Sequence, residues 1–321
     1  MKILICGVGS IGERHINNLL SLGHTDIILY RTSNSELRTL SGDFEVYDSL
    51  DEALSQKPAI AFITNPTSLH ISTAIKCASA GCNLFVEKPL SHNIKNVDTL
   101  NEMVIKKDLV CMTGFMYRYH PLIKKMKEII SSKSLGGLIW IRSSWGEYLP
   151  DWHPWEDYRT GYAAQDKLGG GPTATLSHDL DLAIWFSGSQ VKNFINYQNY
   201  KSELELETSH GNDILIEFLN GVTANVHMDF FQKPYQKEFE LVFSEGKLKF
   251  DYYKNKLDVL KHDGDNDEFI LENFNRNDMF LFEVEDFLDA INNKKGSPIP
   301  INESLKPMQI IANKNNNLNI M

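Results

Sequence analysis

The first third of the chain alternates short, fully apolar runs with longer segments of helical periodicity. Between the runs, apolar positions recur at helical spacing in residues 11–22, 50–55, 69–80 and 94–105. Apolar strands that alternate with amphipathic helices predict a parallel sheet covered on both faces. The runs that we interpret as strands, each bounded by turn residues, are KILICG, DIILY, FEVY, AIAFIT, NLFVE and LVCMT.

After Pro121 the pattern changes. A helix is predicted over 122–131, and the later apolar positions alternate with period two, which is typical of antiparallel strands with one solvated face. Asn220-Gly221 and the sequence SEGK at 244–247 predict hairpin turns. We therefore expect residues 119–321 to form an α+β domain with a mostly antiparallel open sheet. The period-two segments are LIWIRSSW, DILIEF, VTANVHM, FELVF and KLKFDYY.

Composition excludes several classes of partner. The formal net charge is −10 and no basic run is present, so a nucleic-acid partner is not expected. No apolar run approaches the ~20 residues of a membrane span, and we expect no membrane partner. The four cysteines lack zinc-type spacing, which favours buried, reduced thiols in a cytoplasmic protein with no metal site.

The first apolar run leads directly into GVGSIG, with glycines at 7, 9 and 12. This G-x-G-x-x-G lies between a predicted strand and a predicted helix, which is the context of a dinucleotide-binding turn. Gly7 permits the tight turn, Gly9 lets the backbone approach a pyrophosphate, and Gly12 lets helix and strand pack closely. Ser10 and Ile11 open the helix, whose first N–H groups would face the phosphates. Residues 1–118 are therefore predicted to be a Rossmann domain with a doubly wound parallel sheet.

The residues after the second strand bear on the choice of cofactor. An NAD site usually carries an acidic residue there, but this chain reads Tyr30, Arg31, Thr32, Ser33. An arginine followed by two hydroxyls suits a 2′-phosphate. The sequence therefore favours NADP(H), and NAD(H) stays open if Arg31 is an ordinary surface residue.

At this point the chain resembles the glucose–fructose oxidoreductase, inositol dehydrogenase and MocA (Gfo/Idh/MocA) family of oxidoreductases. The resemblance extends over most of the chain, and the loop at 149–164 further resembles members from bacterial surface-sugar pathways. The motifs that carry it are GVGSIGERH (7–15), TNPTSLH (64–70), VEKPLS (86–91), GFMYRYHP (114–121) and LGGGPTATLSHDLDLAIWFSG (168–188).

The resemblance implies roles for several residues. Lys88, beside the nicotinamide, would hydrogen-bond the reacting oxygen and stabilise its negative charge. Glu87 would hold the lysine or the cofactor ribose, and Pro89 restricts the backbone of Lys88. Residues 64–66 (Thr64, Asn65 and Pro66) would line the nicotinamide ribose. His70 is either a cofactor-side group or plain helix surface.

The same resemblance makes His178 the general acid/base, since imidazole has a pKa near neutral. Many members carry an aspartate shortly before this histidine, but the matching positions here are Ala174 and Thr175. Either Lys88 and His178 suffice, with Thr175 as a neutral orienting group, or the activity differs from that of polyol dehydrogenases. Asp179 follows His178 directly and is a further candidate on the substrate side.

Aromatic residues are dense in residues 145–162, and their faces suit the C–H faces of sugars. We expect Trp152 and Trp155 to contact substrate, with Tyr117 approaching the same pocket and Arg118 meeting an anionic group. A hydrophobic lid or a dimer contact is the alternative interpretation of this loop.

The leading hypothesis is therefore an NAD(P)-dependent oxidoreductase that acts on a hydroxyl or keto carbon of a sugar or nucleotide-sugar. Two alternatives remain: a non-catalytic NAD(P)-binding regulator of the same fold, and a reductase of a non-sugar substrate. By analogy with the resembling family, we expect a homodimer or homotetramer formed through the C-terminal sheet. The last helix of the chain can either stay with the second domain or pack against the first domain.

Overall fold

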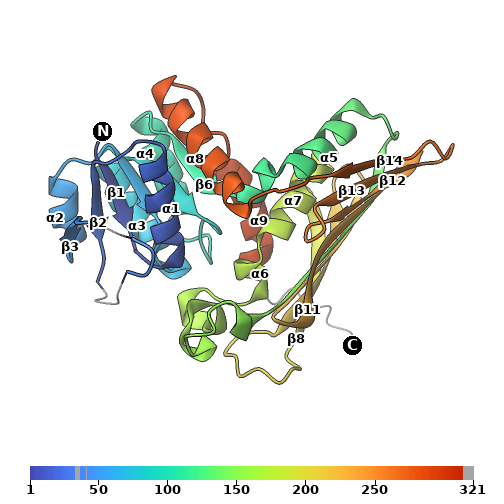
Figure 1. Cartoon of the computed structure of the whole chain (residues 1–321), viewed down its shortest axis with the longest axis horizontal. Helices are drawn as coiled ribbons and strands as arrows, with labels where there is room; N and C mark the ends of the chain where they lie inside the picture. The colour runs from blue at the N-terminus through green and yellow to red at the C-terminus, as the bar shows by residue number, and fades with distance from the viewer. Residues whose placement is uncertain (33–36, 41, 314–321) are drawn as a thin grey trace. The chain divides into compact units, whose positions relative to one another are not determined.

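The computed structural model describes residues 1–32, 37–40 and 42–313. The chain divides into two compact units. The first contains residues 1–116 together with 277–308, and the second contains residues 117–276 with the C-terminal segment from 309. Both units can be followed by their element labels in Figure 1.

The first unit is built on a six-stranded sheet in which every neighbouring pair is parallel. Its order, β3-β2-β1-β4-β5-β6, is that of a doubly wound dinucleotide-binding fold. All six predicted strands are confirmed. Their bounds are β1 Ile3–Cys6, β2 Ile27–Tyr30, β3 Glu45–Tyr47, β4 Ile60–Ile63, β5 Asn83–Glu87 and β6 Cys111–Gly114.

Helices cover both faces of this sheet, which explains why its central strands are apolar throughout. One face packs on α2, α3, α4 and α9 in a continuous apolar core. On the other face, Phe287 of α8 meets Phe62 and Phe85 edge-on, and His15 of α1 packs on the same two rings. The helix bounds are α1 Ser10–Ser21, α2 Leu50–Ser55, α3 His70–Ser79, α4 Val97–Lys106, α8 Arg276–Asn292 and α9 Ile301–Ala312.

The second unit contains an eight-stranded sheet of order β14-β13-β12-β11-β7-β10-β9-β8. Only the β7–β10 pair is parallel, so the mostly antiparallel sheet is confirmed. Both predicted hairpins are present, and Gly221 has the positive φ of +86° that its turn requires. The strand bounds are β7 Leu138–Tyr148, β8 Val191–Asn199, β9 Gly211–Phe218, β10 Thr223–Asp229, β11 Phe231–Phe243, β12 Gly246–Asp251, β13 Lys256–Lys261 and β14 Asp267–Ile270.

Strands β8, β13 and β14 lie outside the segments predicted from periodicity. Strands β8 and β14 form the two edges of the sheet, where few residues are fully buried, and so they lack a clear apolar alternation. Helix α7, His178–Ser187, packs against β7 and β10. The short helix α6, Pro172–Thr175, precedes it, and α5, Pro121–Ser132, begins the unit.

No described helix combines the length and apolar character that a membrane span requires.

Candidate active site

The turn after β1 has the geometry that its glycines predict. Gly7 has a φ of +98°, and a Cβ there would lie 2.6 Å from the backbone of Asn65. A Cβ on Gly12 would lie 2.3 Å from the carbonyl oxygen of Gly7, whereas a Cβ on Gly9 would meet nothing within 4 Å. Helix α1 begins at Ser10, directly after Gly9, and Gly9 supplies no side-chain cap. The turn therefore presents backbone N–H groups, including that of Ile11, to open space, as a phosphate site requires.

The carboxyl end of β4 is tied to this turn. Thr64 donates a hydrogen bond of 2.5 Å from Oγ1 to the carbonyl oxygen of Gly7. Asn65 donates to Thr73 at 2.9 Å, and Pro66 starts the following 3₁₀ turn. His70 is buried, with its Nδ1 2.9 Å from the carbonyl oxygen of Pro89 and its Nε2 2.8 Å from that of Asn65. Since His70 bridges the loops after β4 and β5, it is not plain helix surface.

Glu87 ends β5 with its carboxylate buried against α1. Its Oε1 lies 2.7 Å from Nε2 of His15, and its Oε2 accepts a 3.1 Å hydrogen bond from the backbone N–H of Lys88. Burial alone would raise the pKa of Glu87, but His15 and then the charge of Lys88 outweigh burial and lower it. The ionised carboxylate of Glu87 is therefore fixed against the backbone N–H of Lys88, and Lys88 itself is only partly buried.

The loop after β2 is organised by a carboxylate that the sequence pattern did not indicate. Glu13 of α1 accepts hydrogen bonds from the backbone N–H of Arg38 at 3.0 Å and of Thr39 at 2.7 Å. Arg31 directly follows β2, and its N–H donates to Tyr47. Thr32 is exposed beside it, and Ser33 lies outside the described residues.

His178 is the first residue of α7 and is 1% exposed. The ring of Tyr117 meets it edge-on with centroids 4.8 Å apart, and the ring of Trp145 lies 6.0 Å away. Within the second unit, the predicted acid/base and Tyr117 are thus brought together. Ala174 and Thr175, the two positions that match the family's aspartate by count, lie at the end of α6 and are also buried.

A buried lysine beside this cluster was missed from the sequence. Lys237 of β11 is 0% exposed, and its Nζ lies 3.4 Å from the centroid of Trp145 and 4.3 Å from that of Tyr117. It forms an ion pair with Asp179, which also accepts a hydrogen bond from Ser143. Burial raises the pKa of Asp179 and lowers that of Lys237, and the ion pair opposes both shifts.

Arg118 is likewise paired inside the second unit. Its Nη2 lies 2.6 Å from Oδ1 of Asp181 and its Nε lies 2.9 Å from Oδ2, which makes the contact bidentate. The arginine is 8% exposed. Two residues predicted to contact substrate are therefore held by internal partners: Asp181 engages Arg118, and Lys237 and Ser143 engage Asp179.

The aromatic loop at 149–168 consists of short 3₁₀ turns. Trp152 is half-buried and meets Phe230 edge-on with centroids 5.6 Å apart. Trp155 is 62% exposed. Trp152 is therefore fixed by packing, whereas Trp155 is largely exposed and its ring meets that of His153 with centroids 5.3 Å apart.

These features define a class of protein. The glycine turn leaves the space that a pyrophosphate needs, at the carboxyl ends of β1 and β4 where the strand order reverses. The residues present fit a dinucleotide, and the first unit has the fold of a Rossmann-type dinucleotide-binding domain.

Comparison with known proteins identifies the family. Residues 1–115 match "Oxidoreductase family, NAD-binding Rossmann fold", and residues 123–249 match "GFO/IDH/MocA C-terminal domain". The chain belongs to the Gfo/Idh/MocA family and is an NAD(P)-dependent oxidoreductase.

Individual relatives support this assignment. The chain is 27% identical to the myo-inositol 2-dehydrogenase of Thermotoga maritima, over 93% of this chain and 90% of the relative. Two solved structures share the fold. Levoglucosan dehydrogenase in complex with NADH and levoglucosan has a TM-score of 0.84 at 16% identity, covering 97% of this chain and 95% of that one. The UDP-N-acetylglucosamine 3-dehydrogenase of Acidithiobacillus ferrooxidans has a TM-score of 0.78 at 18% identity, with the same coverage of both chains.

Proposed function

We propose that this protein transfers a hydride between a nicotinamide cofactor and a ring carbon of a sugar or nucleotide-sugar. Lys88 stabilises the substrate oxygen and His178 is the general acid/base. In the oxidative direction a hydroxyl becomes a keto group: the carbon loses a hydride, the oxygen loses a proton, and a C=O bond forms. The cofactor, when bound, supplies or accepts the hydride.

In this proposal each side chain has one task. The Lys88 ammonium donates a hydrogen bond to the reacting oxygen, where negative charge develops as the hydride leaves. His178 takes the hydroxyl proton, and it returns the proton when the reaction runs in reverse. Tyr117, packed edge-on against His178, fixes the plane of the imidazole. No carboxylate stands at Ala174 or Thr175, the two positions that match the family's aspartate, so an orienting group supplied by Thr175 would be neutral.

The observation that carries this proposal is the arrangement at the tip of β5. A lysine follows the last residue of a buried parallel strand, and the carboxylate before it is fixed by His15 at 2.7 Å. Ligands of such sheets bind at the carboxyl ends of the strands. A protein that only sensed the cofactor would need neither this lysine nor a buried histidine at the start of α7.

Single substitutions test the assignment. We expect Lys88→Ala and His178→Ala each to lower kcat by about 10²-fold or more, while nicotinamide fluorescence shows that the cofactor still binds. Thr67→Ala, a buried hydroxyl change in the 3₁₀ turn after β4, is the control for general damage to the first unit. Unchanged turnover in both site variants would refute the assignment and favour the regulatory alternative.

We also propose NADP(H) as the preferred cofactor. Arg31 stands where an NAD site usually carries an acidic residue, and Arg38 is exposed in the same loop. A charge-assisted hydrogen bond to a 2′-phosphate contributes about 1.5–3 kcal/mol, which is roughly 10- to 150-fold in binding. We expect Arg31→Ala to reduce kcat/KM for NADP+ by such a factor and to leave NAD+ unaffected. An NAD+ preference in the unmodified protein would refute the proposal.

The proposed substrate class follows from the aromatic loop and from the names of the relatives, which include an inositol and a UDP-sugar dehydrogenase. Trp155 is the exposed aromatic face best suited to a sugar ring. A panel of sugars, inositols and nucleotide-sugars, read at the absorbance of the reduced cofactor, identifies the class. Activity on an imine and on none of the panel would favour the non-sugar alternative.

We further propose that a second copy of this chain covers the outward face of the eight-stranded sheet. Leu215 of β9 is 52% exposed there and Tyr197 of β8 is 66% exposed, and a groove beside them is lined by Trp140 and Ile195. Exposed apolar faces of this kind mark association surfaces. Light scattering after gel filtration should give a dimer or tetramer, and Leu215→Glu should shift it toward monomer. A monomeric unmodified protein would overturn this part.

A further inference from the structure

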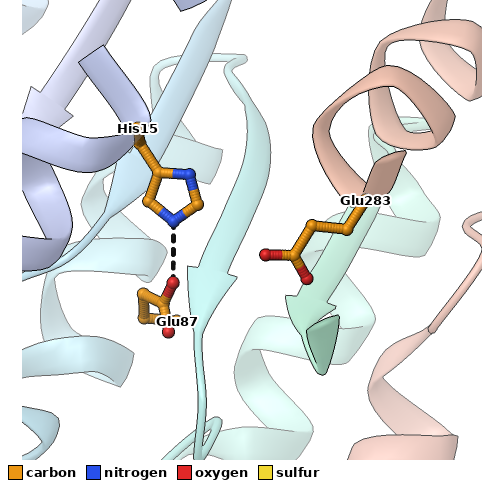
Figure 2. A group of neighbouring side chains, drawn as sticks. All are labelled: His15, Glu87 and Glu283. Carbon is orange, nitrogen blue, oxygen red and sulfur yellow. Dashed lines mark hydrogen bonds and ion pairs between the residues drawn. The ribbon is translucent and has the colours of Figure 1, made fainter. Parts of the chain in front are cut away.

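Three buried polar side chains converge behind the tip of β5. They are His15 of α1, Glu87 of β5 and Glu283 of α8, and their closest ligand-type atoms all lie within 4.8 Å of one another. Exposure is 0% for His15 and Glu283 and 7% for Glu87. Figure 2 shows the Glu283 carboxylate pointing from α8 toward the hydrogen-bonded pair of His15 and Glu87. All three residues belong to the first unit.

Glu283 stands out within this cluster. Neither of its carboxylate oxygens has a hydrogen-bond partner among the residues that the structure describes. The cluster has aromatic surroundings, because His15 packs on Phe62, Phe85 and Phe280, and Phe280 lies three residues before Glu283 on α8. An ionised carboxylate left unpaired in such surroundings is strongly unfavourable. A positive species must therefore accompany Glu283.

The charged groups around Glu283 determine whether this positive species is a proton or a metal ion. Glu87 from β5 is the nearest charge, His15 from α1 already bonds Glu87, and Arg14 from α1 stacks on Phe280 at 4.7 Å. Burial, followed by the charge of Glu87, raises the pKa of Glu283 well above its usual value, whereas the pKa of Glu87 is lowered. Two carboxylates this close divide in this way, with one ionised and the other protonated.

A divalent metal ion fits the cluster less well than a proton does. Nε2 of His15 and Oε1 of Glu87 lie 2.7 Å apart, which is a hydrogen-bond distance. Two ligand atoms on a tetrahedral metal would be roughly 3.4 Å apart at usual bond lengths. A metal would therefore have to break the contact that fixes Glu87.

We propose that His15, Glu87 and Glu283 form a buried binding site for one proton, which resides on Glu283 at neutral pH. The neutral acid group of Glu283 then faces the ionised Glu87, so the two carboxyl groups together carry one negative charge instead of two. The proposal concerns the fold and the proton alone, and it does not depend on the proposed reaction.

The pH dependence of stability gives the first test. The native state holds a proton on Glu283 that the unfolded state releases above pH ~4.5. Rising pH must therefore destabilise the native state, and the unfolding equilibrium constant should increase by up to about tenfold per pH unit. Glu283→Gln mimics the neutral acid and lacks this dependence. We expect the ratio of the two unfolding constants to change progressively between about pH 5 and pH 8. Glu285→Gln, at an exposed position of the same helix, should show no such change.

Infrared spectroscopy gives a second test that does not depend on stability. The unmodified protein should show the carbonyl stretch of a protonated buried carboxylic acid at neutral pH. This band should be absent from Glu283→Gln and present in Glu285→Gln. If Glu283→Gln fails to fold, titration of the band in the unmodified protein still decides the question.

Two outcomes would overturn the proposal. One is a neutral-pH spectrum without the protonated band, together with a flat stability ratio. The other is a stoichiometric divalent metal, found by elemental analysis of protein purified without chelator, whose removal lowers the melting temperature of the unmodified protein but leaves Glu283→Gln unchanged.

Discussion

Replacing Lys237 with methionine removes a fully buried charge while keeping most of the side-chain volume. Its partner Asp179, also 0% exposed, would then be left as an unpaired buried charge. Breaking a buried ion pair from one side typically costs about 3–5 kcal/mol of stability. The ammonium also lies 3.4 Å from the Trp145 ring centroid, and a desolvated cation–π contact of this kind contributes about 2 kcal/mol or more. We expect Lys237→Met to lower the free energy of unfolding by at least ~3 kcal/mol.

The partner variant and the double variant isolate the pair. Asp179→Asn should also destabilise strongly, because it leaves the lysine unpaired. The double variant should recover much of the loss, with a coupling energy of about 2 kcal/mol or more. Urea unfolding followed by tryptophan fluorescence is the assay, since all five tryptophans lie in the second unit.

Lys247→Met is the matched control. Lys247 pairs with Glu240 at 3.2 Å, but their side chains are 39% and 25% exposed, so its loss should cost less than about 1 kcal/mol. The reasoning fails if Lys237→Met costs no more than Lys247→Met. It also fails if the two single effects simply add in the double variant.

Two further predictions follow from the backbone and from a histidine. Gly7→Ala should abolish cofactor binding, since its Cβ would lie 2.6 Å from Asn65, whereas Gly23→Ala, also at positive φ but in open space, should cost about 1–2 kcal/mol of stability and keep binding. Calorimetric titration separates the two, and equal binding would contradict the turn geometry. Hydrogen bonds to Asp213 and then Asp229 raise the pKa of His227 from 6.5 to about 9. The stability that this contributes is present below pH 6.5 and is lost as pH rises through 9, so His227→Gln should flatten the melting-temperature profile across that window. An unchanged slope would count against a charged His227.

The parallel sheet could be predicted because its central strands β1, β2 and β4 are buried on both faces and are therefore apolar at nearly every position. The glycine turn could be predicted because glycine has no Cβ, and a tight turn with a close backbone approach requires that residue. Lys237 was missed, although its position held a usable signal. Phe239, Leu241 and Phe243 alternate on the buried face of β11, and the same parity places Lys237 there.

Glu283 is a similar case on a helix. Met279, Phe280, Val284 and Phe287 form the buried stripe of α8, and Glu283 falls inside that stripe. Its partners could not be predicted from local pattern, because His15 and Glu87 lie in distant parts of the chain. The partners of Arg118 and of Asp179 could not be predicted for the same reason: the sequence around a charged residue does not indicate which distant residue it contacts.

Helix α8 makes the first unit discontinuous in sequence. Phe287 completes an aromatic cluster whose other rings, Phe62 and Phe85, are translated some two hundred residues earlier. During synthesis, the nucleotide-binding sheet must therefore persist with one face covered by α1 but not by α8 until the whole of the second unit has left the ribosome. A fragment ending near residue 118 would leave that face partly exposed, so it should need a chaperone or a co-expressed α8 segment to remain in solution.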